Sequence, residues 1–354
     1  MKIGILTFHE ADSYGAVLQA YALQETLKKL GAESEFVQIV RNTPEQVPAA
    51  PATGAAALFA RKIQAEGKKR EALFTAFREQ YMHISKPYSP ADPIDSAYDS
   101  FIAGSDQIWN FRIPGADVRY FLPFAAPEKR NSYAASFGAD ELPEKAREWT
   151  AVQLGSFRTL SVREESGRAI VEALTGRKPM VCVDPTLLPE RSEWEAMAPE
   201  TEEAPYVLLF LLKYEEPLVQ KAKAYAQSLG LPLKVITAAF MPQMGIAAWN
   251  TTGVTEWLSA IRNARCVFTN SFHGMVFSMI FGRSFHIFRL TGELSSRNGR
   301  LEEMLAFLEL EEALADVVAP DYDRVWQKLA KRREDSLEFL RRIVRYDPNT
   351  EYYI

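Results

Sequence analysis

The chain has few of the residues that hold disulfides or metal ions. It contains two cysteines and four histidines in 354 residues, and Cys182 and Cys266 both lie in apolar, strand-like runs. No pair of histidines has the H-x-x-x-H spacing of a helical metal site. Isolated cysteines in apolar surroundings are typical of buried thiols. We therefore expect two buried cysteines and no metal site; the spacing does not decide whether they form a disulfide.

Long apolar runs and a strong net charge are also absent. No stretch reaches the roughly 20 apolar residues that span a bilayer, and the first residues predict a strand rather than a signal peptide. The net charge of -5, with 25% charged residues, is ordinary for a globular protein and gives no reason to expect a nucleic-acid partner. We expect a cytoplasmic protein.

The glycine motifs of common nucleotide and acyl-transfer sites are missing. The first strand is not followed by G-x-G-x-x-G, and the chain contains neither a P-loop nor a G-x-S-x-G elbow. A dinucleotide fingerprint and a nucleophile elbow are therefore excluded as explanations of function.

Strands and helices alternate along the chain. Residues 3–8 predict a strand, 16–30 a helix that Gly31 ends, and 36–40 a second strand. Further strands are expected at 101–103, 132–136, 160–162 and 180–183, with a loop at 44–57 and a helix at 68–82. A second series has strands at 207–212, 233–237, 266–268 and 285–288, and helices at 217–229, 255–264 (with Thr255 as N-cap) and 275–281.

Alternating strands and helices are typical of parallel sheets. Two such series predict an α/β fold with two Rossmann-like domains that face a cleft. We place the N-terminal domain at 1–189, the C-terminal domain at 190–320 and a helical tail at 321–354.

The tail predicts one long helix over 322–345. Its apolar stripe is formed by Trp326, Leu329, Leu337, Leu340 and Val344, and basic residues occupy much of the other surface. Such a helix either packs on the domain with a solvated basic face, which we favour, or makes weak peripheral contact with the inner face of an anionic membrane.

Polar residues gather where predicted strands end. Ligands of open α/β sheets bind at that edge, so these residues are expected to meet in one cleft. They are His9, Ser13, Tyr14 and Gly15, then Ser105, Asp106 and Gln107, then Arg163, and finally Ser271 and His273.

The stretch Ser271-Phe272-His273-Gly274 carries the most chemistry. It joins a buried strand to a buried helix, and backbone N–H groups at a helix start can hold an anion. A histidine beside a bound anion can exchange a proton near neutral pH. A capped helix with a packed histidine is the simpler alternative.

An ordered set of motifs resembles the polysaccharide pyruvyl transferase family. The set is Gly4-Ile5-Leu6-Thr7-Phe8-His9, Tyr14-Gly15-Ala16-Val17-Leu18-Gln19-Ala20-Tyr21-Ala22-Leu23, Gly104-Ser105-Asp106-Gln107-Ile108-Trp109-Asn110, Val162-Arg163-Glu164, Asp184-Pro185-Thr186-Leu187-Leu188, Ser271-Phe272-His273-Gly274 and Ser295-Ser296-Arg297. The resemblance implies a GT-B-like fold and transfer of a pyruvyl group from phosphoenolpyruvate to two hydroxyls of a glycan or lipid-linked sugar, giving a ketal and phosphate. It suggests a role in exopolysaccharide or cell-envelope synthesis, with phosphoenolpyruvate as substrate and no cofactor.

The resemblance also implies site residues. His273 matches the family's histidine and is expected to be catalytic, with Asp106 as a base for the acceptor hydroxyl. The donor is expected to be bound by Arg163, Ser271, Gly274 and Arg297. The acceptor side of the cleft is expected to be formed by His9, Ser13, Tyr14, Gly15, Ser105 and Gln107. Some relatives carry Arg-Leu-His-Gly at the histidine turn, so this chain lacks an arginine at position 271. Arg297 or Arg283 is expected to compensate.

Two other functions remain open from the sequence. One is a glycosyltransferase that uses a nucleotide-sugar donor in the same kind of cleft. The other is a non-catalytic sugar-binding member that has lost the donor arginine, because fold alone does not fix function.

Overall fold

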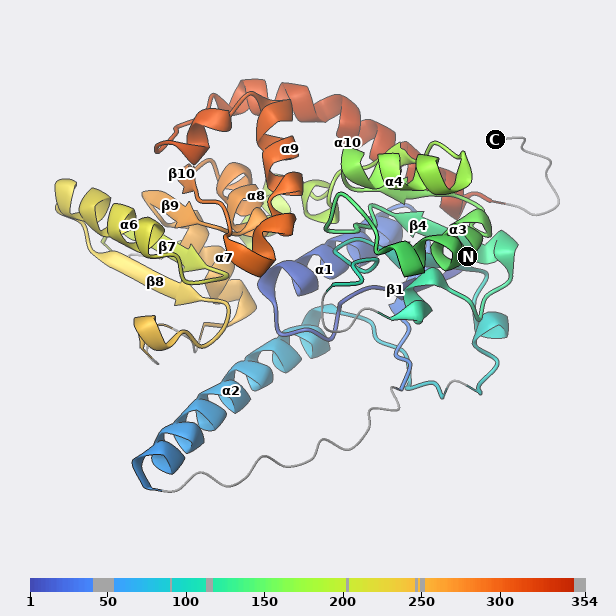
Figure 1. Ribbon diagram of the computed structural model, residues 1–354, viewed down its shortest axis with the longest axis horizontal. Helices are drawn as coiled ribbons and strands as arrows, with labels where there is room; N and C mark the ends of the chain where they lie inside the picture. The colour runs from blue at the N-terminus through green and yellow to red at the C-terminus, as the bar shows by residue number, and fades with distance from the viewer. Residues whose placement is uncertain are drawn as a thin grey trace.

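The computed structural model describes residues 1–40, 54–89, 91–112, 117–201, 204–245, 248 and 252–346. Two parallel sheets occupy opposite halves of the molecule (Figure 1). The first half contains β1 (Lys2–Leu6), α1 (Tyr14–Lys29), β2 (Glu33–Phe36), α2 (Gly54–Tyr81), β3 (Ser100–Gly104), β4 (Arg130–Tyr133), α3 (Glu144–Gly155), β5 (Ser161–Val162), α4 (Glu165–Thr175) and β6 (Met180–Val181). The rest contains α5 (Arg191–Met197), β7 (Val207–Leu211), α6 (Glu216–Ser228), β8 (Leu233–Thr237), α7 (Val254–Arg262), β9 (Cys266–Thr269), α8 (Phe272–Ile280), β10 (Ser284–Ile287), α9 (Gly299–Leu308) and α10 (Tyr322–Val344).

The first sheet has the strand order β2-β1-β3-β4, and the short pair β5-β6 continues beyond β4 through an Ala135–Val162 bridge. β1 is central: Ile5 pairs in parallel register with Phe36 on one side and Ile102 on the other. The carboxyl ends of β1 and β3 therefore lie together. A hydrogen bond of 3.0 Å from the Thr7 hydroxyl to the Ser105 carbonyl joins the two segments that follow them.

The second sheet has the order β10-β9-β7-β8, and its paired strands are all parallel. The chain leaves β7 and β9 at the same edge, where the Leu212 N–H donates to the Asn270 side chain at 2.8 Å. These two sheets, each alternating with helices, confirm the predicted α/β architecture of two Rossmann-like halves. Both cysteines are buried, as expected, and both are free, which the sequence did not decide.

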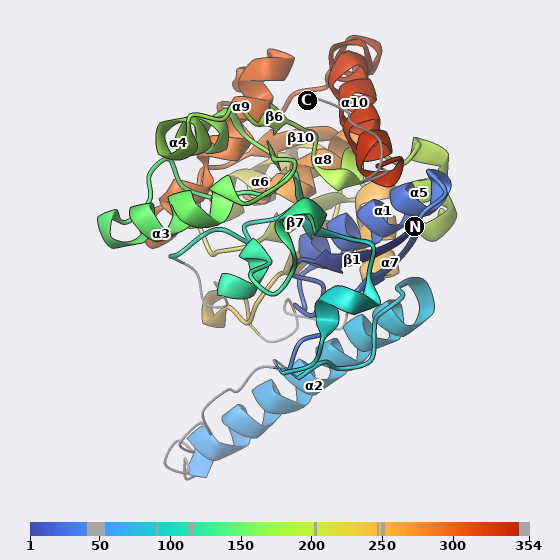
Figure 2. The ribbon, with the colours of Figure 1, turned by 90° about the vertical axis from the view of Figure 1, so that its right-hand side faces the viewer.

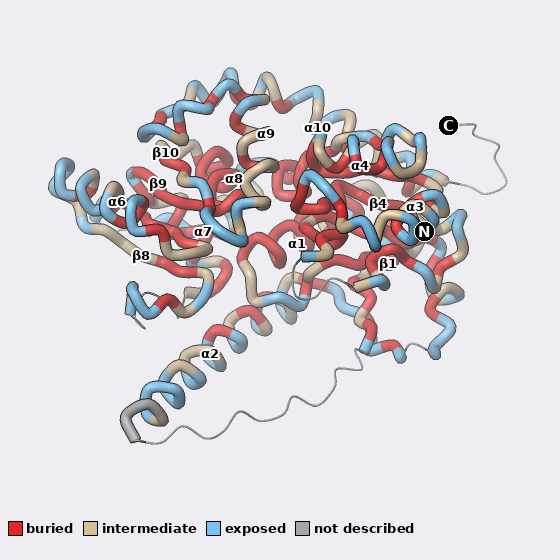
Figure 3. The backbone as a smooth tube through the Cα atoms, in the orientation of Figure 1, coloured by how far each residue is buried: buried red, intermediate tan, exposed pale blue. Residues whose placement is uncertain are grey.

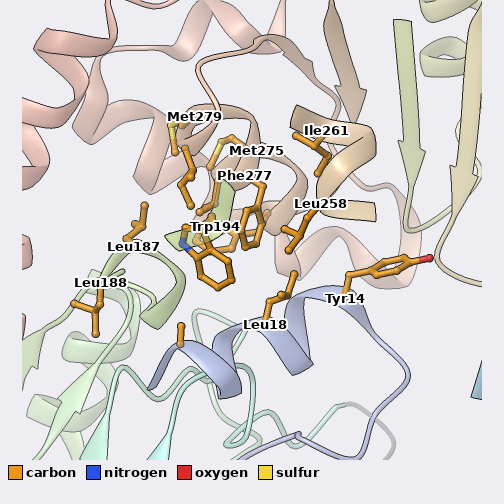
Figure 4. Close-up of a cluster of buried hydrophobic side chains, with 14 of the residues drawn as sticks. Tyr14, Leu18, Leu187, Leu188, Trp194, Leu258, Ile261, Met275, Phe277 and Met279 are labelled. Atoms are coloured by element: carbon orange, nitrogen blue, oxygen red, sulfur yellow. The ribbon is translucent and has the colours of Figure 1, made fainter. Parts of the chain in front are cut away.

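One apolar core runs through both halves (Figure 4). Tyr14 and Leu18 of α1 belong to the first half, yet they pack with Trp194, Leu258 and Phe277 from beyond residue 190. The Tyr14 ring stacks on Trp257 with 4.9 Å between ring centroids. Figure 3 shows α1, β1 and β9 mostly buried, whereas β8 is largely of intermediate burial. Since each large apolar side chain contributes about 1.5–3 kcal/mol when fully buried, α1 ties the two halves together.

Several predicted boundaries move for local reasons. The second strand was expected at 36–40, but β2 ends at Phe36 because the following residues pair with another segment, as in the Val40 N–H bond to Tyr88. The strand expected at 132–136 stops at Tyr133, since Ala134 has a φ of 48°, outside the strand region.

Several helix starts were also wrong, among them that of α8, which begins at Phe272 rather than at 275. α7 begins at Val254 with Gly253 as its N-cap, so Thr255 lies inside the helix. The loop expected at 44–57 lies outside the described residues up to 53, and α2 has already begun at Gly54. The four helices α3, α4, α5 and α9 were not predicted.

The tail helix α10 packs against both halves. It runs along the top of the molecule in Figure 1 and buries Val325, Leu329, Leu340 and Ile343. Its basic side chains bond to nearby acceptors. Arg333 donates to the carbonyls of Leu187 and Leu188 and pairs with Glu190. Lys331, Arg341 and Arg342 pair with acids of the same helix. This packing favours the packed-helix interpretation. Among the described helices, none has the length and apolarity needed to cross a membrane.

Candidate active site

A cleft of about 540 Å³ opens at the carboxyl edges of the two sheets. Its walls come from the loop after β1 and the start of α1, from the segment after β3, from the start of α8, and from the region 297–300. The two halves thus contribute to a single cavity, as the sequence predicted.

His273 lies in the first turn of α8. Ser271 is the N-cap of this helix, and its hydroxyl accepts a hydrogen bond of 3.2 Å from the Gly274 N–H. Gly274 packs against β9, where a β-carbon would lie 2.7 Å from the Thr269 hydroxyl oxygen. The glycine therefore lets α8 start close to the sheet, and the helix start then carries His273 to the cleft wall.

A buried carboxylate, Asp184, lies behind His273. Its Oδ2 accepts a hydrogen bond of 2.7 Å from Arg163 Nη1 and lies 3.4 Å from His273 Nε2, within ion-pair distance but without hydrogen-bond geometry. Its Oδ1 accepts from the N–H and hydroxyl of Thr186 at 3.0 and 2.7 Å. Asp184 thus links the segment after β6 to the guanidinium and the imidazole.

The environment keeps Asp184 ionised. Burial opposes its charge, but His273 and Arg163 outweigh that effect and hold the Asp184 pKa well below its ordinary value. The neighbouring carboxyl of Glu164 behaves in the opposite way, because burial raises its pKa and Arg163 and Ser136 offset this only in part. Asp184 is therefore the fixed negative charge beneath the cleft.

Asp106 has a strained backbone and two cationic neighbours. Its φ is 63°, in the left-handed region that non-glycine residues rarely adopt. Its Oδ1 lies 3.7 Å from both Arg163 Nη2 and Arg300 Nη1. The turn after β3 thus directs a carboxylate toward two guanidinium groups.

Arg300 supplies a cation that the sequence analysis missed. It lines the cleft with Arg297, and with the Gln107 amide oxygen turned toward it both terminal nitrogens donate at 2.8 Å. Burial, and secondarily the like charge of Arg163, lowers the Arg300 pKa to about 10. Since Arg300 lines the cleft, its guanidinium is suited to take an anion there.

The start of α1 closes the other side of His273. Ser13 is the N-cap but its side chain forms no capping hydrogen bond. Gly15 lies against the imidazole, since a β-carbon there would fall 2.0 Å from Nδ1. Tyr14 is anchored instead: its hydroxyl donates to the Thr252 carbonyl at 2.8 Å and accepts from Arg70 at 3.0 Å, and burial raises its pKa.

The structure brings together most of the residues predicted from the sequence. Those that line the cleft are His9, Ser13, Tyr14, Gly15, Asp106, Gln107, Ser271, His273 and Arg297. Arg163 does not line it: its side chain is 2% exposed and lies beneath Phe272, with 5.2 Å from the guanidinium to the ring. Gly274 and Ser105 are likewise buried below the surface of the cleft.

Two further residues depart from expectation. Arg283 lies away from the cleft, where its Nε donates to the Phe281 carbonyl, so it cannot replace an arginine at position 271. The sequence prediction gives Asp184 no role, although an acid in an Asp-Pro-Thr turn after a predicted strand is a signal for one. Arg300 follows Arg297 by three residues, which was the only hint of its position.

In the part of the chain that the structure describes, no three His, Cys, Asp or Glu side chains are grouped to hold a metal ion. The polar groups of the cleft are instead guanidinium, imidazole, carboxylate and amide groups. Such a set can bind an anion and exchange protons with a second ligand.

Solved structures resemble the whole chain in fold. A protein from Listeria monocytogenes assigned as a UDP-N-acetylglucosamine 2-epimerase has a TM-score of 0.50 and 9% identity, over 96% of this chain and 90% of that one. The UDP-GlcNAc 2-epimerase of Neisseria meningitidis has a TM-score of 0.45 and 11% identity, over 98% and 95%. The spinosyn rhamnosyltransferase SpnG has 0.40 and 10%, over 97% and 95%. The first of these likenesses, at a TM-score of 0.50, is one of fold alone and agrees with the GT-B-like arrangement expected from the sequence.

A search of curated proteins finds no match. The sequence comparison with family models is more specific. The model of the polysaccharide pyruvyl transferases matches residues 14–290, which include the start of α1, Asp106, Asp184 and the histidine turn of α8. The chain therefore belongs to the polysaccharide pyruvyl transferase family.

Proposed function

We propose that the protein transfers the pyruvyl group of phosphoenolpyruvate onto two hydroxyls of one sugar, forming a cyclic ketal and releasing phosphate. The observation that supports this most is the position of His273, which lines the same cleft as Arg297 and Arg300 and has ionised Asp184 behind it. Phosphoenolpyruvate carries a phosphate and a carboxylate, and guanidinium groups suit both.

The reaction needs proton transfers at defined points. The methylene carbon of the donor takes up a proton, and the adjacent carbon becomes electrophilic. The first hydroxyl oxygen bonds to that carbon and loses its proton, and the carbon–oxygen bond to phosphate breaks. The second hydroxyl then bonds to the same carbon and loses its proton, so that one of the two released protons replaces the one taken up and the other leaves with phosphate.

We assign each part of this reaction to residues of the cleft. His273 exchanges the proton at the donor, because its imidazole lines the cleft and lies beside ionised Asp184. Arg297 and Arg300 hold the donor's anionic groups, and the uncapped start of α1 adds backbone N–H groups. Asp106 accepts the proton of the attacking hydroxyl. The sugar acceptor, free or lipid-linked, is proposed to lie on the side of the cleft formed by the loop after β1.

A ligand panel tests the donor. We expect phosphoenolpyruvate to raise the thermal midpoint of unfolding, because a ligand that binds the native state stabilises it by mass action. A shift with UDP or GDP and none with phosphoenolpyruvate would favour the nucleotide-sugar alternative. Sugar binding without any donor binding would favour a non-catalytic member of the family. Phosphate release on adding glycan acceptors, followed by 31P NMR, then tests the transfer itself.

A further inference from the structure

The helix α2 extends from the body of the molecule as an arm. It has 28 residues, which corresponds to about 42 Å, and it projects away from the two halves in both Figure 1 and Figure 2. Its inner part is fixed to the molecule, since Arg70, Phe74 and Phe77 are buried. Its outer part, residues 57–69, is mostly exposed, and we call this segment the α2 arm.

The α2 arm exposes large apolar side chains. Leu58 is 68% exposed and Phe59 is 50% exposed, and Ile63 is partly exposed one turn further on. Phe59 also contacts Phe240, with 5.8 Å between ring centroids, so the arm reaches the loop that follows β8. An exposed leucine and phenylalanine on a projecting helix mark a contact surface more strongly than scattered apolar residues do.

The α2 arm is also basic on an acidic protein. Residues 57–69 contain Arg61, Lys62, Lys68 and Lys69 against one acid, Glu66, whereas the whole chain has a net charge of -5. Lys69 pairs with Glu66 at 2.8 Å, and within the described residues the other three basic side chains form no ion pair. Exposed apolar side chains beside unpaired basic ones can insert among lipids while the charges attract an anionic lipid surface.

The inner part of α2 is linked to the cleft. Arg70 donates to the Asp12 carbonyl at 3.0 Å, and Arg78 pairs with the Asp12 carboxylate at 3.1 Å. Asp12 belongs to the loop after β1, and its neighbours Ala11 and Ser13 line the cleft. A surface that binds the α2 arm would therefore hold the molecule by the same helix that contacts this loop.

We propose that the α2 arm binds the surface of an anionic lipid membrane, with Leu58 and Phe59 inserted among the lipids and the basic side chains at the headgroups. An arm-to-arm contact with a second copy of the chain suits the arm less well, because two arms of like charge would repel each other. The proposal agrees with the proposed function if the sugar acceptor is lipid-linked, but it does not depend on it.

Vesicle flotation tests the proposal without donor, acceptor or turnover. The probes are vesicles of phosphatidylcholine alone and vesicles of phosphatidylcholine with phosphatidylglycerol, at low and high ionic strength. We expect binding to the anionic vesicles at low ionic strength, loss at high ionic strength, and little binding to phosphatidylcholine. Leu58→Ser with Phe59→Ser should weaken binding at least tenfold, and each of Arg61→Gln, Lys62→Gln and Lys68→Gln should weaken it roughly fivefold.

Two controls match these changes. Val152→Ser alters a side chain on α3 that is 66% exposed, close to the exposure of Leu58. Lys331→Gln with Arg342→Gln removes exposed charges from α10 and so tests the tail. Both should leave vesicle binding within about twofold of the unchanged protein. The proposal is overturned if the unchanged protein does not bind, if the α2 variants bind normally while the α10 variant does not, or if sedimentation shows a dimer that the Leu58 and Phe59 changes dissociate.

Discussion

Gly15 and His273 touch across the two halves of the molecule: a β-carbon on Gly15 would lie 2.0 Å from the imidazole Nδ1. Only a hydrogen atom fits there, so the start of α1 fixes where the ring can lie. Asp184 lies 3.4 Å from the other ring nitrogen, Nε2. The imidazole is therefore held between a helix from the first half and a buried carboxylate.

Replacing Gly15 should move the His273 imidazole. In Gly15→Ala the new methyl group must displace His273 or α1, and overpacking of this kind costs about 1–3 kcal/mol of unfolding free energy. We expect a fall of at least tenfold in pyruvyl transfer, measured as phosphate release. Gly155→Ala is the matched control, since a β-carbon at that helical glycine meets nothing within 4 Å. Equal activity of the two variants would contradict the role given to Gly15.

His273→Ala should remove proton transfer while leaving the fold intact. General acid–base residues typically contribute about 10²–10⁴-fold to rate, and we expect a loss in that range with donor binding retained. The measurements are phosphate release and the thermal shift with phosphoenolpyruvate. His83→Ala, at an exposed histidine outside the cleft, is the control. A variant that turns over at nearly the unchanged rate, or one that unfolds, would return His273 to a packing role.

The two arginines near Asp106 should respond differently to lysine. Arg300 lines the cleft, so Arg300→Lys should weaken phosphoenolpyruvate binding about tenfold through loss of the planar fork. Arg163 is buried and bound to Asp184, so Arg163→Lys should lower thermal stability more than it lowers donor affinity. Isothermal titration and thermal unfolding of both variants separate the effects. Weaker donor binding by Arg163→Lys at unchanged stability would mean that Arg163 reaches the donor, as the sequence alone suggested.

The sequence predicted the candidate site best for residues that follow the ends of predicted strands. His9, Asp106 and His273 each follow a predicted strand, and the parallel arrangement brings such positions to one edge. Whether a side chain is buried could not be predicted from its position after a strand. Arg163 also follows a strand, but its guanidinium points beneath the cleft because Asp184, 21 residues later, accepts its hydrogen bond.

Arg300 shows the other limit of the sequence. The helix that begins at Gly299 was not predicted, and no pattern relates position 300 to the strand that ends at Gly104. The two meet only because the halves fold against each other, which places Arg300 3.7 Å from Asp106. The sequence could therefore predict that another cation replaces the arginine missing at position 271. Which residue supplies that cation depends on the tertiary structure.

Asp184 should control the stability of the protein in acid. Its folded-state pKa is held below the value of about 3.9 expected in an unfolded chain. As the pH falls, the unfolded chain takes up the proton first, which favours unfolding. The stabilisation by ionised Asp184 is thus fully present above about pH 5 and is lost progressively below about pH 4.

Replacing this carboxylate tests the argument. Asp184→Asn leaves Arg163 buried without its nearest counter-charge, and such a change costs about 3–5 kcal/mol at neutral pH. The variant should also lose part of the decline in stability below about pH 4, measured by urea unfolding at a series of pH values.

Thr186→Val removes one hydrogen bond to Asp184 and should act in the same direction by a smaller amount, which keeps the test open if the asparagine variant does not fold. Asp140→Asn, at an exposed carboxylate, should leave the decline in stability below about pH 4 unchanged. Identical pH profiles for the unchanged protein and the two Asp184-site variants would show that the carboxylate is not the ionised group that this site requires.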